Sequence, residues 1–147
     1  MHSSRVRGSR AIARMAAVAL VMALVLGACF TPQQRKVTQY VNNSRSAQGV
    51  RPVSQNLQLT LKAQAWAEQL ARSGRLKHSK LSAGITVRWR SLAENVGYGS
   101  SIRKVHLSYM RSPGHRANIL NGRFDYIGTG WAKRGDRVYT VQVFMDY

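Results

Sequence analysis

Acidic residues are scarce in this chain of 147 residues. It has 5 Asp and Glu against 23 Lys and Arg, which gives a formal net charge of +18 at pH 7. A surface of this kind attracts polyanions and anionic membranes, and salt screens the attraction. The sequence contains no helix-turn-helix, zinc-finger or RNA-binding motif, so nucleic acid is not the expected partner. A basic solvated surface without a dedicated partner stays open as an alternative.

Long apolar runs and cysteines are also lacking. The apolar run Met15–Leu26 follows the basic stretch His2–Arg14 and is shorter than the ~20 residues that span a bilayer. A basic segment followed by a short apolar one predicts an export signal over residues 1–28. The chain has one cysteine, Cys29, so an internal disulfide is excluded.

The position of Cys29 suggests a use for it. The sequence Leu26-Gly27-Ala28-Cys29 resembles a bacterial lipobox, in which the cysteine becomes the lipidated first residue of the mature protein. We therefore expect an extracytoplasmic protein anchored to the cell membrane through lipidated Cys29, because several acyl chains make anchoring stable. Ordinary cleavage after Ala28, which would give a secreted protein with a thiol, is the alternative.

The remaining sequence predicts helices followed by a hairpin. Residues 29–34 are expected to form a short tether, and residues 35–147 a single domain. Helical periodicity covers 31–49, 59–74 and 102–112, and extended segments are expected over 92–99, 126–132 and 138–145. Trp66 lies on the apolar stripe of the second helix and is expected in the core. Gly128 and Gly130 share one face of a strand and allow close approach of a neighbour. This order indicates an α+β fold.

A break in the last helical region produces the first candidate site residue. Pro113 ends a helix, and Gly114 permits a bend, so a new helix is expected to begin near His115. The positive end of the helix dipole favours the neutral imidazole, which is the form that binds a metal or accepts a proton. The alternative is an interior histidine that fixes the bend by hydrogen bonds.

Glu94 and His78 complete the candidate site. Glu94 is one of five acids and lies within an apolar strand, so its carboxylate must be paired, hydrogen-bonded or ligating. A buried salt bridge to an arginine such as Arg116 is the alternative. His78 lies in a loop after the second helix. We expect His78, Glu94 and His115 to meet in one open cleft, whereas His106 is expected as a boundary residue that flanks the apolar stripe of the third helix.

Several segments resemble a known family. Ser112-Pro113-Gly114-His115-Arg116-Ala117-Asn118-Ile119-Leu120, Ala93-Glu94-Asn95-Val96 and Leu76-Lys77-His78-Ser79 resemble motifs of bacterial CAP (SCP/PR-1-like) domains. The resemblance runs from about Val37 to Tyr147. It implies an α-β-α sandwich with a central antiparallel sheet and a terminal β-hairpin.

The resemblance also implies a cleft with two histidines and two acids, which binds zinc in some members. The histidines correspond to His78 and His115, and the first acid corresponds to Glu94. The second acid has no counterpart on the third helix near Tyr109, and Asp125 is only a distant substitute.

Two functions follow as expectations. The first is a binding or interaction module at the cell envelope, with a lipid, glycan or protein ligand and with anionic envelope components or the membrane surface as partners. The second is a zinc-dependent hydrolase that uses His78, Glu94 and His115, in which the metal would acidify a bound water. The positive surroundings oppose binding of a dication.

Overall fold

The computed structural model describes residues 29–147, so the predicted export signal lies outside the described residues. The elements are α2 (Pro32–Ala47), β1 (Ser54–Gln55), α3 (Leu57–Ser73), β2 (Ser91–Gly99), α4 (Ile102–Arg111), α5 (Pro113–Leu120), β3 (Tyr126–Arg134) and β4 (Arg137–Asp146). Residues Pro32–Tyr147 form one compact unit that contains the whole sheet and both apolar cores. The α+β class is confirmed. Across residues 29–147, no helix combines the length and apolar character needed to cross a bilayer.

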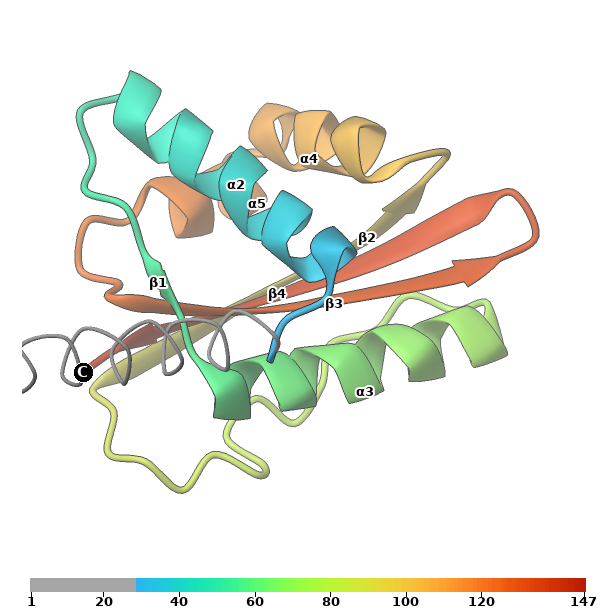
Figure 1. The fold of residues 1–147 in the computed structure, drawn as a ribbon, viewed down its shortest axis with the longest axis horizontal. Helices are drawn as coiled ribbons and strands as arrows, with labels where there is room; N and C mark the ends of the chain where they lie inside the picture. Colours follow the sequence, from blue (N-terminus) through green and yellow to red (C-terminus); the bar gives the residue numbers. More distant parts are fainter. Residues whose placement is uncertain (1–28) are drawn as a thin grey trace, which may run out of the picture. The chain divides into compact units, whose positions relative to one another are not determined.

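The sheet has the strand order β1-β3-β4-β2, with α3 on one face and α2, α4 and α5 on the other (Figure 1). The strand β4 pairs antiparallel with both β2 and β3, whereas β1 pairs parallel with β3. The sheet is therefore mixed and not purely antiparallel as expected. The strand β1 has only two residues, and so short a segment has no alternating pattern that a sequence can reveal.

On one face of the sheet, α3 lies directly against β3. A Cβ atom at Gly128 would lie 2.0 Å from the carbonyl carbon of Leu59, and one at Gly130 would lie 2.1 Å from the carbonyl oxygen of Ala63. The close approach expected at these glycines is present. The apolar core on this side contains Leu59, Ala63, Ala67, Leu70, Ala71, Val96, Ala132, Tyr139, Val141, Val143 and Met145.

On the other face, a buried arginine joins two segments. The guanidinium of Arg45, at the end of α2, is fully buried and donates to four backbone carbonyls. The acceptors are Arg51 at 2.7 Å, Ile119 at 2.8 Å, Asn121 at 2.9 Å and Phe124 at 3.3 Å. Burial, followed by the charge of Arg51, lowers the pKa of Arg45, but a guanidinium stays protonated in proteins. This residue therefore fixes the chain after α5 against α2.

The N-terminal boundary of the helical domain differs from the expectation. Helix α2 begins at Pro32, so Pro32–Gln34, at the end of the predicted tether, are helical. Gln34 is buried, and its side-chain amide donates to the Oε1 of Gln64 in α3 at 3.1 Å. The carbonyl of Gln34 also accepts a hydrogen bond from Thr129 at 3.0 Å. These contacts hold the first turn of α2 in place.

Two aromatic side chains also differ from the expectation. Trp66 is half-buried at the edge of the core, and its indole N–H donates to the carbonyl of Lys77 at 3.0 Å. His106 is buried and stacks on Tyr40 with 5.5 Å between the ring centroids. Its Nε2 lies 2.8 Å from the Oγ of Ser44, and burial lowers its pKa. His106 thus belongs to the contact between α2 and α4 and is not a boundary residue.

Candidate functional site

The candidate site is built on β2, which is an edge strand of the sheet. Leu92 and Val96 pack with the core on the α3 side, whereas Ala93 packs with the opposite core. Because side chains alternate along a strand, Glu94 faces the α3 side and Asn95 faces the side of α4 and α5. Two polar residues that are adjacent in the sequence therefore serve opposite faces of the sheet.

Glu94 is held by the loop that follows α3. Its side chain is only 2% exposed. Its Oε1 accepts the backbone N–H of Ser79 at 2.9 Å and lies 2.8 Å from the Nδ1 of His78, while its Oε2 accepts the hydroxyl of Ser79 at 2.6 Å. The carboxylate is thus hydrogen-bonded through both oxygens, and its ion-pair partner is His78 and not an arginine such as Arg116.

His78 is oriented by this carboxylate but remains accessible. Its side chain is 63% exposed, and only Nδ1 faces Glu94. When Nδ1 carries the proton and donates it to Glu94, Nε2 keeps the lone pair. A carboxylate behind an imidazole fixes the tautomer and makes the ring a better ligand or base. The structure therefore brings two of the three predicted site residues into direct contact.

His115 lies on α5, which begins at Pro113, two residues before the expected restart. Ser112 precedes it with extended backbone geometry, as expected for a residue before proline. The ring of His115 is half-buried and tilted against that of Tyr109, with 4.9 Å between centroids. Burial lowers the pKa of His115, and positive charge on His78 lowers it further. His115 therefore favours its neutral form.

Asn95 positions the His115 segment. It is fully buried, and its amide donates to the carbonyl of His115 at 3.1 Å and to the Oε1 of Gln142 at 3.0 Å. Its Oδ1 accepts the side-chain amide of Asn118 at 2.9 Å. A buried amide needs such partners, which is the signal that could have marked Asn95 as a positioning residue in the sequence. Sequence reasoning also missed Ser79.

Tyr109 lies in the region of the third helix where a second acid was sought. Its hydroxyl donates to the carbonyl of Thr140 at 2.8 Å, and complete burial raises its pKa. Gly97 makes room for the ring, because a Cβ there would lie 2.8 Å from it. The distant substitute Asp125 pairs with Arg51 at 2.6 Å, and hydrogen bonds from Arg51 and Tyr147 lower its pKa.

The geometry bears on the predicted zinc ligands. Within residues 29–147, no group of three or more histidine, cysteine, aspartate or glutamate side chains is arranged to hold a metal ion. Both oxygens of Glu94 are engaged, so this carboxylate fits the role of orienting His78 better than that of a direct ligand. His78 and His115 are the residues that could supply nitrogen ligands.

Comparison with known proteins identifies the family. The profile of the Cysteine-rich secretory protein family, CAP, matches residues 38–144, which is more than half of the chain. The chain belongs to the CAP family. This CAP protein is 27% identical over 118 residues to the uncharacterized protein YkwD of Bacillus subtilis, an alignment that covers 74% of this chain and 46% of YkwD.

Solved structures show the same CAP fold. A cysteine-rich secretory protein of Staphylococcus aureus is 25% identical with a TM-score of 0.66, over 78% of this chain and 39% of that one. An extracellular SCP-domain protein of Bacillus anthracis is 20% identical with a TM-score of 0.68, over 80% of this chain and 44% of that one. This CAP protein thus spans less than half the length of these relatives.

Proposed function

We propose that this CAP domain is a binding or interaction module on the outer side of the cell membrane, with its ligand received beside His78 and His115. The observation that carries the proposal is the state of Glu94. Its carboxylate is buried, and three contacts from His78 and Ser79 engage both of its oxygens. A general base must be within reach of the proton that it takes, and Glu94 is instead committed to holding the loop.

The location is part of the same proposal. The B. anthracis relative is described as extracellular, and the order of basic, apolar and cysteine segments in this chain is that of an exported protein anchored through Cys29. Anionic envelope components suit a charge of +18. A small lipidic or glycan ligand is the proposed occupant of the site.

A zinc-dependent hydrolase is the second candidate. The contact between Glu94 and His78 favours it, because metal-binding histidines commonly donate their second N–H to a carboxylate. NaASP2, a structural relative that is 12% identical, has been solved with Zn²⁺. His78 and His115 would hold the ion, which when bound would make a water more acidic. The protein itself would orient His78 through Glu94 and keep His115 neutral by burial.

Zinc titration calorimetry separates the two candidates. If zinc binds at this site, Glu94→Gln should weaken its affinity by about 10- to 100-fold, because the imidazole loses its orienting carboxylate. His106→Gln, which changes a histidine outside the site, is the matched control and should leave the affinity unchanged. Hydrolysis of peptide or ester substrates that requires zinc and disappears in His115→Ala would overturn the binding-module proposal.

Ligand binding and anchoring need separate assays. Soluble peptidoglycan fragments and a spin-labelled fatty acid serve as glycan and lipid probes. The binding module should hold one of them in the presence of EDTA and lose it in His115→Ala. Feeding cells a labelled fatty acid should label the wild-type protein but not Cys29→Ser, and labelling of both proteins would refute anchoring through Cys29.

A further inference from the structure

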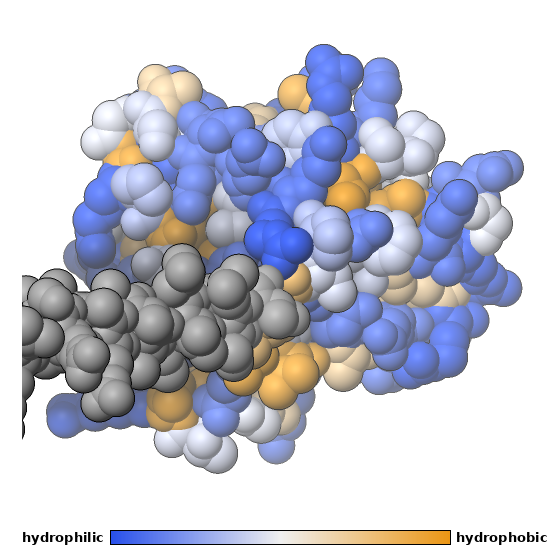
Figure 2. Space-filling view, in the orientation of Figure 1, coloured by the Kyte–Doolittle hydropathy of each residue, from blue (hydrophilic) through white to orange (hydrophobic). Residues whose placement is uncertain are grey.

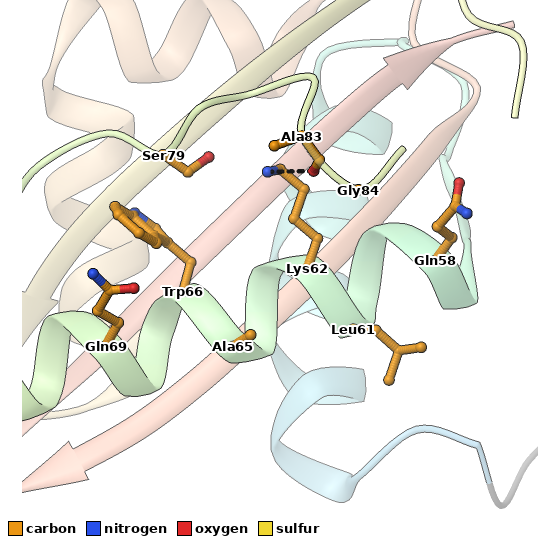
Figure 3. A pocket seen from close by; sticks show the side chains of 9 residues that line it. All are labelled: Gln58, Leu61, Lys62, Ala65, Trp66, Gln69, Ser79, Ala83 and Gly84. Carbon is orange, nitrogen blue, oxygen red and sulfur yellow. Dashed lines mark hydrogen bonds between the residues drawn. The ribbon is translucent and has the colours of Figure 1, made fainter. Parts of the chain in front are cut away.

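A groove runs along the outward face of α3, beneath the loop that carries His78. Its volume is about 470 Å³, and its walls include Leu61, Lys62, Trp66 and Ala83 (Figure 3). Ser79 also lines it, and the hydroxyl of the same residue binds the Glu94 carboxylate. We call α3 and the loop of residues 75–90 together the α3 face.

Two polar side chains of the groove, Lys62 and Gln58, already bind other groups of the protein. The ammonium of Lys62 donates to the carbonyl of Lys80 at 2.9 Å. It also donates to the carbonyl of Ala83 at 3.0 Å (Figure 3). The amide of Gln58 donates to the hydroxyl of Thr86 at 2.7 Å and accepts the backbone N–H of the same residue at 3.0 Å. A glycan would have to compete with the protein for these hydrogen-bonding groups, so the groove is poorly suited to binding a sugar.

The α3 face instead exposes apolar side chains. Within residues 29–147, eight large hydrophobic residues are exposed, and five of them belong to this face. They are Leu57 (47% exposed), Leu61 (64%), Leu76 (44%), Val87 (37%) and Trp89 (39%). Figure 2 shows hydrophobic surface on the side where α3 lies and also on the side of α2 and α4. Single exposed hydrophobics need no explanation, but a concentration of them marks an interaction surface.

Cations frame these side chains. Residues 75–90 contain five basic residues and no acid. The basic residues are Arg75, Lys77, Lys80, Arg88 and Arg90. The ammonium of Lys77 lies 5.4 Å from the ring centroid of Trp66, so cationic and aromatic groups are interleaved. Apolar side chains framed by Lys and Arg favour the interface of an anionic bilayer, where each cation near the surface contributes about 1 kcal/mol.

The predicted anchor is joined to the domain through α2, whose first turn contacts α3. Cys29 precedes Pro32 by three residues, which is at most about 10 Å of extended chain. The first turn of α2 contacts α3 through the hydrogen bond between Gln34 and Gln64. An acyl group on Cys29 would therefore be connected to this contact by only a few residues of chain.

We propose that the α3 face docks on a bilayer that contains anionic phospholipid. The exposed leucines of α3, together with Val87 and Trp89, enter the boundary between headgroups and acyl chains, and the loop cations pair with lipid phosphates. This inference rests on the proposed location at the envelope, but it does not depend on the ligand of the His78 site.

Vesicle co-sedimentation tests the proposal with residues 32–147, which form a compact unit without the predicted anchor. The vesicles contain phosphatidylcholine with or without phosphatidylglycerol. The domain should bind only the vesicles with phosphatidylglycerol, and the double variant Leu61→Ser/Trp89→Ser should bind them about tenfold more weakly. Leu107→Ser, which removes an exposed leucine of α4, is the matched control and should bind as the wild type does.

Other outcomes would overturn the proposal. Equal binding by the double variant and the wild type would mean that charge alone acts. Competition by a soluble acidic glycan that abolishes vesicle binding would assign the surface to a polymer. His115→Ala should keep vesicle binding while losing the small ligand, so a failure of the proposed ligand site is distinguishable from a failure of lipid docking.

Discussion

The two faces of the central sheet are secured by different kinds of contact. On the α3 side, the backbone of the helix touches β3 because Gly128 and Gly130 have no side chains. On the other side, an apolar core is supplemented by buried polar groups: Arg45 joins α2 to α5, and Asn95 joins β2 to α5. The first face depends on the lack of side chains at Gly128 and Gly130. The second depends on the hydrogen bonds of Arg45 and Asn95. A substitution should therefore act by overpacking on the first face and by leaving polar groups unpaired on the second.

The largest effect is expected where α3 meets β3. In Gly128→Ala the new methyl group would overlap the backbone of Leu59, which cannot swing away as a side chain can. We expect a loss of more than about 3 kcal/mol in the free energy of unfolding, measured by urea denaturation. Gly122→Ala, whose Cβ would meet nothing within 4 Å, should change it by less than about 0.5 kcal/mol. Equal midpoints for the two variants would show that α3 can move off the sheet at little cost.

A smaller effect is expected from Arg45→Met on the polar face. The variant leaves the carbonyls of Ile119, Asn121 and Phe124 without their donor, at an expected cost of about 2–4 kcal/mol in thermal unfolding. Arg51→Met is the control, because it removes only the exposed ion pair with Asp125 and should cost less than about 1 kcal/mol. If both variants melted alike, the buried contacts of Arg45 would not be what secures this face.

The smallest expected effect is the change of folding stability with pH that arises from His106 at the contact between α2 and α4. Burial holds the pKa of His106 below its ordinary value of 6.5, so the unfolded chain binds a proton at higher pH than the folded one. The stability contributed by neutral His106 is complete above that value and is lost as the pH falls through the window below it. His106→Gln should therefore lose less stability than the wild type between about pH 7 and pH 5. Tyr40→Phe keeps the stacked rings and should show the same dependence of unfolding free energy on pH as the wild type. If His106→Gln also kept that dependence, the effect would be assigned to His115.

The sequence could predict the features that have local signals. Gly128 and Gly130 revealed close packing because they alternate along a strand. The family motifs identified the fold. Trp66 packs against the core as expected but is only half-buried, because helical periodicity does not show how completely a residue is covered. For the same reason, periodicity did not reveal that His106 meets α2.

The candidate site was only partly readable. A lone carboxylate in an apolar strand had to have a partner, but the choice of His78 and Ser79 depends on a loop that returns over 15 residues of chain. The role of Asn95 depends on which side of β2 it faces. The effect of His78 on the pKa of His115 depends on their distance in space, which spacing along the chain does not give.

The hydrogen bonds from Arg45 to backbone carbonyls have a consequence for the range of pH and salt in which the domain stays folded. Its acceptors are backbone carbonyls, which have no ionisation of their own near neutral pH, and no carboxylate within residues 29–147 forms an ion pair with it. Unlike an ordinary salt bridge, these hydrogen bonds do not weaken when the pH falls or the salt concentration rises. The connection between α2 and α5 is therefore indifferent to such changes.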